Sequence, residues 1–165
     1  MKLIACLGNP GRQYARSRHN IGYIIGEALA ERFSVRLSQK KFQALMGTGS
    51  TGGSDFTLLF PTTFMNNSGV AVRGAMDYFK LDVGELIVIH DEIELPFGDV
   101  RVKEGGGHKG HNGLRSIIEH IGSPDFTRVR FGVGRPPDER IGVAEYVLAP
   151  FLEEEIEKIR DMMDG

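Results

Sequence analysis

Two stretches of the sequence place acid–base side chains directly after buried segments. His19 follows the first apolar run and its turn, and Asp91 follows the apolar run 86–89. A histidine can take a proton from water near neutral pH when a second group orients its ring and stabilises the cation. We expect Asp91 to be that group, with Glu92 and Glu94 as competing carboxylates. A histidine at a helix start is more often structural, so the pairing is a hypothesis.

Four asparagines lie in turns or loops beside apolar segments: Asn9, Asn66, Asn67 and Asn112. Side-chain amides donate hydrogen bonds at any pH, so they suit a substrate carbonyl and the oxyanion that develops on it. Turn formation is the more ordinary role of any single asparagine. Four of them at the ends of elements favour a site for carbonyl chemistry.

The glycine-rich loop 105–113 admits three interpretations. It lacks the Gly-Lys-Ser/Thr ending of a nucleotide P-loop, and no Rossmann spacing follows the first strand, so nucleotide binding is disfavoured. His108 and His111, with His90 and the two carboxylates after it, could ligate a metal. Their spacing fits no helical zinc signature, and flexible glycines make a poor metal cage. We therefore expect a mobile gate and no metal or other cofactor.

The elements that must position these residues alternate between strands and helices. Apolar spacing predicts strands over 3–7, 41–49, 56–60, 86–89, 99–103 and 127–133. It predicts helices over 21–33, 68–79, 114–121 and 152–163, and leaves 143–148 ambiguous between strand and helix. The glycine-rich turn 50–54 joins two of these strands as a hairpin, so we expect a layered α/β domain with a mixed sheet.

Length and composition are those of one globular domain, with 165 residues, 41% hydrophobic and 25% charged. The single cysteine, Cys6, lies inside the first apolar run, so no intramolecular disulfide can form. We expect a buried thiol and a cytoplasmic protein. No apolar run approaches the ~20 residues of a membrane span, and the N-terminal residues fall short of the ~15 to 30 residues of a secretory signal.

Charge is arranged in blocks along the chain. Basic blocks at 1–46 and 101–137 alternate with acidic blocks at 47–100 and 138–165, and the net charge is −2. If the fold joins the basic blocks, the protein presents a positive face to a polyanion. Separate solvated faces are an equally good interpretation from charge alone.

Several multi-residue motifs follow one another in a specific order. They are Leu7-Gly8-Asn9-Pro10-Gly11, Tyr14, Arg18-His19-Asn20-x-Gly22, Pro61 to Asn66 with Ser68-Gly69, His90-Asp91-Glu92, and the glycine loop 105–113. From Leu3 to about Pro150 the chain thereby resembles bacterial peptidyl-tRNA hydrolases. The resemblance implies a single-domain, three-layer α/β/α fold over 1–165 with a mixed, mostly parallel twisted sheet. It also implies a monomer that hydrolyses the ester between peptide and tRNA without a metal.

The resemblance implies roles for the matching residues. His19 would be the general base, Asp91 the group that keeps it basic, and Asn9 the residue that distinguishes blocked from free aminoacyl groups. The positions that match contacts to the aminoacyl or tRNA part are Tyr14, Phe64, Asn66 and Asn112, and Met65 and His111 would line the same cleft. The basic positions that match contacts to tRNA phosphates are Arg101 and Lys103. The chain ends at Gly165, earlier than many relatives, which leaves the role of the last helix's end open.

Two other functions stay open. An RNA-binding protein on the same scaffold, as some plant organellar splicing factors are, would have lost the chemistry, and the retained His19 and Asp91 argue against that. A nucleoside or peptide hydrolase is disfavoured because the resemblance lies in motifs as well as in fold class. No serine stands in a Gly-x-Ser-x-Gly elbow, and Cys6 is badly placed for attack, so the expected nucleophile is water.

Overall fold

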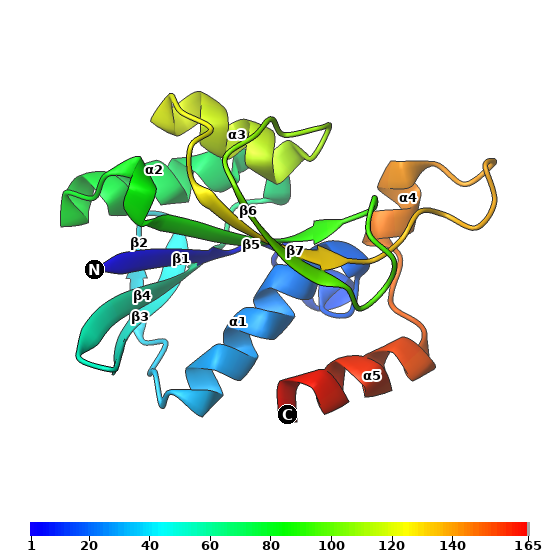
Figure 1. The fold of residues 1–165 in the computed structure, drawn as a ribbon, viewed down its shortest axis with the longest axis horizontal. Coiled ribbons are helices and arrows are strands. Elements are labelled where there is room, and N and C mark those ends of the chain that lie inside the picture. Colours follow the sequence, from blue (N-terminus) through cyan, green and yellow to red (C-terminus); the bar gives the residue numbers. More distant parts are fainter. Residues whose placement is uncertain (165) are drawn as a thin grey trace.

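The computed structural model describes residues 1–164, and a seven-stranded sheet forms its centre (Figure 1). The strands are β1 (Lys2–Cys6), β2 (Gln39–Lys41), β3 (Ala44–Thr51), β4 (Ser54–Pro61), β5 (Leu86–Glu92), β6 (Val100–Glu104) and β7 (Thr127–Gly132), in the order β2-β3-β4-β1-β5-β7-β6. The four neighbours β4, β1, β5 and β7 run parallel, whereas β3 and β6 are antiparallel to their neighbours. The prediction of a mixed, mostly parallel sheet is confirmed.

Helices cover both faces of this sheet. They are α1 (Ile21–Arg32), α2 (Ser68–Phe79), α3 (Asn112–Ile121), α4 (Val143–Leu148) and α5 (Glu153–Asp164). Figure 1 shows α2 and α3 on one face and α1 and α5 on the other, which gives the three layers. Within residues 1–164, no helix has the length and apolar character needed to cross a membrane.

The residues of β1 alternate between two cores. Leu3 and Ala5 belong to the core shared with α2 and α3, whereas Cys6 belongs to the core beneath α1. Cys6 is fully buried, as predicted, and burial raises the pKa of its thiol far above the ordinary value. It is therefore an inert core residue.

A close contact between α1 and β1 brings the turn that carries His19 to the end of the strand. A Cβ at Gly22 would lie only 2.5 Å from the backbone nitrogen and oxygen of Leu7, so this position requires glycine. The amide of Tyr23 donates to the carbonyl of Leu7 at 3.1 Å. Because the helix begins directly against the strand end, the short 3-10 turn Arg18–Asn20 that precedes it lies at the rim of the sheet.

The hairpin region departs from the prediction at both turns. The predicted strand 41–49 begins only at Ala44, because the chain reverses at Phe42 and Gln43, which have φ angles of 58° and 56°. Bulky residues rarely adopt this left-handed conformation, so the pair carries no turn signal and β2 was missed. The second turn is tighter than 50–54, since the strands continue to a two-residue loop at Gly52 and Gly53, both with positive φ.

Arg18 ties the C-terminal part of the chain to the turn Arg18–Asn20. Its amide donates to the carbonyl of Ala149 at 3.2 Å, and its buried guanidinium donates to the carbonyl of Tyr146 at 3.2 Å. The guanidinium carbon also lies 4.0 Å from the centre of the Tyr146 ring, and a terminal nitrogen lies 3.5 Å from the Glu155 carboxylate. Both α4 and α5 are thereby fixed beside the turn, and the ambiguous segment 143–148 is a helix.

Candidate active site

A cleft of about 720 Å³ opens at the carboxyl ends of the parallel strands, where ligands bind in open α/β sheets. Of the residues expected in the site, those that line it are Asn9, Tyr14, His19, Phe64, Met65, Asn66, Asp91, Lys103, His111 and Asn112. Arg101 is not among the lining residues. It is exposed on β6, with its guanidinium 3.8 Å from the carboxylate of Asp99.

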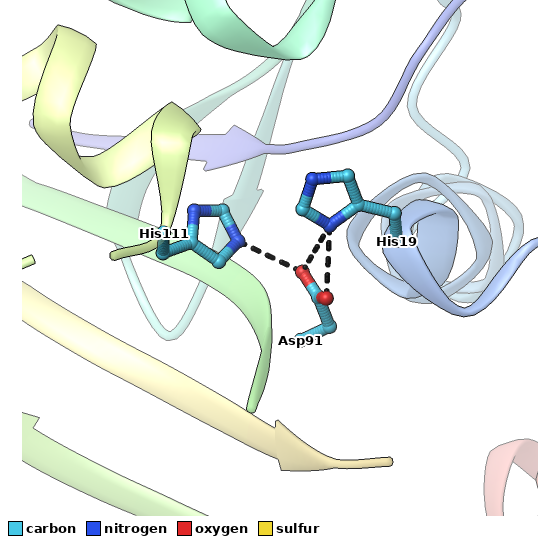
Figure 2. A group of neighbouring side chains, drawn as sticks. All are labelled: His19, Asp91 and His111. Carbon is cyan, nitrogen blue, oxygen red and sulfur yellow. Dashed lines mark hydrogen bonds and ion pairs between the residues drawn. The ribbon is translucent and has the colours of Figure 1, made fainter. Parts of the chain in front are cut away.

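His19 and Asp91 form a close buried pair in this cleft (Figure 2). Nδ1 of His19 lies 2.9 Å from both carboxylate oxygens of Asp91, at the end of β5. Since a carboxylate only accepts, Nδ1 carries the proton and Nε2 keeps a free lone pair. No protein group within residues 1–164 is hydrogen-bonded to Nε2. The expected pairing is present in the geometry, and Nε2 is in the form that can accept a proton.

The electrostatics of the pair favour a basic imidazole. Burial by itself lowers the pKa of His19, but the charge of Asp91 and its hydrogen bond outweigh burial, so the pKa lies above the ordinary value. Burial raises the pKa of Asp91, yet the charges and hydrogen bonds of His19 and His111 hold it well below its usual range. Asp91 is therefore ionised, and it stabilises the imidazolium that forms when His19 accepts a proton.

His111 contacts the same carboxylate from the opposite side, as Figure 2 shows. Its Nε2 donates to Oδ1 of Asp91 at 2.8 Å. Its Nδ1 accepts from the backbone amides of Gly113 at 3.1 Å and Leu114 at 3.2 Å, so His111 is the N-cap of α3. The neutral ring protonated at Nε2 satisfies all three contacts. The sequence indicated a cleft position for His111 but not this capping role.

His19, Asp91 and His111 place one ligand atom each within 4.8 Å of one another, close enough for a metal ion. The hydrogen bonds oppose that use. Nε2 of His111 could bind a metal only after its proton moved to Nδ1, toward which two backbone N–H groups already point. His108, from the metal alternative, lies outside this group of three, and its Nδ1 accepts from the amide of Gly110. The donor set therefore fits proton transfer better than metal binding.

Asn9 lies just beyond β1 with the orientation of its amide fixed by the backbone of Met65. The amide of Met65 donates to Oδ1 of Asn9 at 2.6 Å. Because a backbone N–H can only donate, the oxygen must face Met65, which leaves Nδ2 as the group available to a ligand. Asn20, which the sequence placed in a motif but not in the site, bonds to the backbone of Asn9 through both atoms of its amide.

A row of cations forms one wall of the cleft. Arg101 pairs with Arg130 and Lys103 with Arg128 in the antiparallel register of β6 and β7, so the four side chains share one face. Lys103, Arg128 and Arg130 line the cleft, and Arg130 is bonded to the Glu92 carboxylate at 3.1 Å. The alternation of basic residues in 127–133 was visible in the sequence, but a role for the two arginines in the site was not inferred.

Arg128 holds the base of the glycine loop. Its guanidinium is almost fully buried and donates to the carbonyls of Gly107 at 2.7 Å and Pro124 at 2.9 Å, and also to that of Gly106. The far end of the loop is held by the hydrogen bond between His111 and Asp91. These contacts hold both ends of the loop, and its action as a gate stays a prediction.

A second wall of the cleft is apolar. The wall consists of Ile93 and of Val143, Ala144, Val147 and Leu148 from α4. Elsewhere in the lining, the rings of Tyr14 and Phe64 meet edge to face with centroids 6.5 Å apart, and Phe64 is 55% exposed. The wall was missed because the segment 143–148 is too short for its periodicity to decide its structure.

Comparison with known proteins identifies similar sequences and structures over nearly the whole chain. A family model described as Peptidyl-tRNA hydrolase matches residues 3–165. The peptidyl-tRNA hydrolase of Syntrophotalea carbinolica is 46% identical over 100% of this chain and 86% of its own, and that of Bacillus subtilis is 42% identical over 99% and 87%. A crystal structure of the peptidyl-tRNA hydrolase of Acinetobacter baumannii matches with a TM-score of 0.91 at 38% identity, covering 99% of this chain and 83% of that one.

Proposed function

The chain belongs to the peptidyl-tRNA hydrolase family, whose reaction is hydrolysis of the ester bond between peptide and tRNA, and we propose that His19 is its general base. The observation that carries this proposal is the contact of His19 Nδ1 with both oxygens of the ionised Asp91, 2.9 Å away, which leaves Nε2 free in the cleft. No covalent nucleophile is required, because the ester is activated enough for a polarised water.

In the proposed reaction, His19 Nε2 takes a proton from a water molecule as the water oxygen attacks the ester carbon. The electron pair of the carbonyl moves to its oxygen, and amide donors of Asn66 and Asn112, which line the cleft, stabilise that oxyanion. The tetrahedral intermediate then expels the ribose oxygen of tRNA, which takes the proton back from His19. Asp91 remains ionised throughout and orients the ring.

Asn9 is the proposed selectivity residue. Its oxygen is engaged by Met65, so Nδ2 is the group left to donate to the carbonyl of the amide that blocks the amino group. A free aminoacyl-tRNA lacks that carbonyl and instead brings a cationic amine, which carries a desolvation cost and cannot accept from Nδ2. N-blocked substrates are therefore favoured both by the hydrogen bond that they gain from Nδ2 and by the desolvation cost that a free amine carries.

The cationic wall is the proposed binding surface for the tRNA acceptor arm and 3′ end. Lys103 and Arg130 line the cleft, and Arg101 continues the same face outside it. Arg128 adds its charge from beneath the glycine loop, because its guanidinium is bonded to the loop carbonyls. Phosphate contacts carry little sequence information, which suits an enzyme that must accept every elongator tRNA. The exposed ring of Phe64, with Tyr14 beside it, offers a surface on which an unpaired base can stack.

We further propose that the protein works as a monomer, without a metal, in the cytoplasm. Support for a monomer is that one chain supplies the base, its carboxylate, the amides and the cationic wall. Support for metal-free chemistry is the capping contact of His111 Nδ1, which fixes its proton on Nε2. The buried single cysteine fits a reducing compartment.

The decisive experiment incubates the protein with N-acetyl-aminoacyl-tRNA, with and without chelator, beside the His19→Ala variant. Release of N-acetyl-amino acid that resists chelator and is lost in the variant supports the proposal. Tight tRNA binding without release would favour the RNA-binding alternative instead. Release that disappears with chelator would contradict the metal-free mechanism.

A further inference from the structure

The side chain of Asn20 is committed to the backbone of Asn9. The amide of Asn9 donates to Oδ1 of Asn20 at 2.8 Å, and Nδ2 of Asn20 donates to the carbonyl of Asn9 at 2.9 Å. Asn20 is 1% exposed, so these bonds are shielded from water. The Asn20 side chain thus pairs with both the backbone N–H and the backbone carbonyl of Asn9, as a neighbouring strand would in a sheet.

This use of Asn20 differs from what its position would suggest. Asn20 occupies the N-cap position of α1, where an asparagine side chain ordinarily accepts from the first free amides of the helix. Here the side chain makes no capping hydrogen bond and contacts Asn9 instead. The residue therefore forgoes the helix-capping role, and stability of α1 does not account for its placement.

Three hydrogen bonds together determine where the Asn9 side chain points. Two join the Asn20 side chain to the backbone of Asn9, one in each direction, and in the third the amide of Met65 donates to Asn9 Oδ1. Asn20 also follows His19 directly in the 3-10 turn Arg18–Asn20. The turn that carries His19 thus also carries the residue that holds Asn9. The position of the Asn9 amide is therefore fixed relative to the His19 ring.

We propose that Asn20 is a positioning residue that holds the Asn9 Nδ2 donor in register with the His19 imidazole, and so fixes the selectivity for N-blocked substrates. The inference rests on the proposed function of Asn9 and His19. Asn20 touches neither substrate nor water in this scheme and acts only through Asn9. The two hydrogen bonds between Asn20 and the Asn9 backbone form a clamp. Loss of the clamp should weaken recognition of the blocking amide while leaving both the His19–Asp91 pair and the cationic wall intact.

The first test compares Asn20→Ala with wild type on N-acetyl-aminoacyl-tRNA and on free aminoacyl-tRNA. We expect the ratio of the two kcat/KM values to fall about tenfold, the effect of one misplaced hydrogen bond. The pH dependence of kcat should keep its midpoint, because the contacts of His19 with Asp91 remain. A wild-type ratio would overturn the proposal, and a displaced midpoint would assign Asn20 to holding His19 instead.

Ser17, directly before the turn Arg18–Asn20, offers a matched control. It is 1% exposed, and its hydroxyl has no hydrogen-bond partner within residues 1–164, so Ser17→Ala removes a buried polar atom without breaking a contact. We expect its selectivity ratio to equal that of wild type. An equal fall in Ser17→Ala and Asn20→Ala would mean that the ratio responds to any change in the turn, and would overturn the specific role of Asn20.

A double-mutant cycle keeps the proposal testable if Asn20→Ala does not fold. Asn20→Asp preserves shape and the acceptor for the Asn9 amide but places an oxygen against the Asn9 carbonyl, so the clamp is half lost. In an Asn9→Ala background this change should have little further effect on the ratio, because the amide to be positioned is gone. Independent, multiplying effects would refute the coupling. Absence of any hydrolysis by wild type would instead overturn the proposed function.

Discussion

The two sides of the cleft hold their polar groups in different ways. On the side of β1 and β5, the contacts among His19, Asp91 and His111 assign a definite proton to each ring. On the side of β6 and β7, Arg128 is fixed by the carbonyls of the glycine loop, but Arg130 is bonded to the Glu92 carboxylate, which a phosphate oxygen could replace. Proton transfer requires that each histidine have a defined protonated nitrogen. RNA binding requires cations whose present hydrogen-bond partners can be replaced by phosphate. The following substitutions test this division.

Replacing the proposed base, His19, should have the largest effect. We expect His19→Ala to lower kcat by about 10²- to 10⁴-fold, the usual contribution of a general base, with almost no change in tRNA affinity. Single-turnover rates at saturating N-acetyl-aminoacyl-tRNA measure the first quantity and filter binding measures the second. Near-normal turnover would remove His19 from the mechanism, and a large loss of affinity would mean that the two sides are not separate.

Asp91→Asn should be nearly as damaging, for a different reason. An amide can donate to His19 Nδ1, which would force the proton onto Nε2 and leave no lone pair for water. In molecules that keep the productive tautomer, loss of the carboxylate charge lowers the pKa of His19 from its raised value. Because the base works deprotonated, the acidic limb of the rate profile should move to lower pH. A profile of kcat against pH with an unmoved limb would contradict the pairing.

Asn9→Asp should change selectivity more than rate. One carboxylate oxygen can still accept from Met65, but the other replaces the Nδ2 donor with a negative charge. That charge repels the blocking carbonyl and attracts a free ammonium group, so the preference for N-acetyl-aminoacyl-tRNA should fall about 10- to 100-fold. Parallel rate assays on the two substrates give this ratio. If both rates fall equally, Asn9 shapes the turn and selectivity lies elsewhere.

The smallest effects should come from the cationic side, where Arg101 and Lys103 form a natural pair of variants. Lys103→Ala removes a cation from the cleft wall, whereas Arg101→Ala removes one outside it. We expect Lys103→Ala to flatten the slope of log affinity against log salt by about 0.7 to 0.9, the loss of one phosphate contact, for every tRNA tested. Arg101→Ala should have less effect. An unchanged slope in both would move the tRNA to another surface.

Sequence reasoning located the candidate residues correctly where they lie at the ends of elements. The apolar run 86–89 ended at Asp91, and the helical spacing after His19 fixed that residue at a helix start, so both could be expected at one edge of the sheet. The extra strand β2 could not be expected, because Phe42 and Gln43 adopt a left-handed turn that their types disfavour. Tertiary contacts stabilise a conformation that local propensity argues against.

The hydrogen bonds that fix which nitrogen of each histidine is protonated could not be predicted from the sequence either. Whether Nδ1 of His111 accepts from α3 or holds a proton depends on where the helix begins relative to Asp91, which motif spacing does not reveal. The roles of Asn20 and Arg128 were missed for the same reason, since each bonds to backbone atoms of another segment. Every residue has a backbone carbonyl, so the amino-acid sequence does not show which carbonyl a side chain will contact.

The contacts of Arg18 have a consequence for the order of folding. They join residue 18 to residues 146, 149 and 155, so the turn that carries His19 is closed by segments more than 120 positions later in the chain. Contacts of such long sequence separation form late, because a large loop must be closed before they contribute. During synthesis, the sheet and α1 can assemble while this turn still lacks its contacts with Tyr146, Ala149 and Glu155. The proposed active centre should therefore mature only after α5 has left the ribosome, later than the sheet on which it is built.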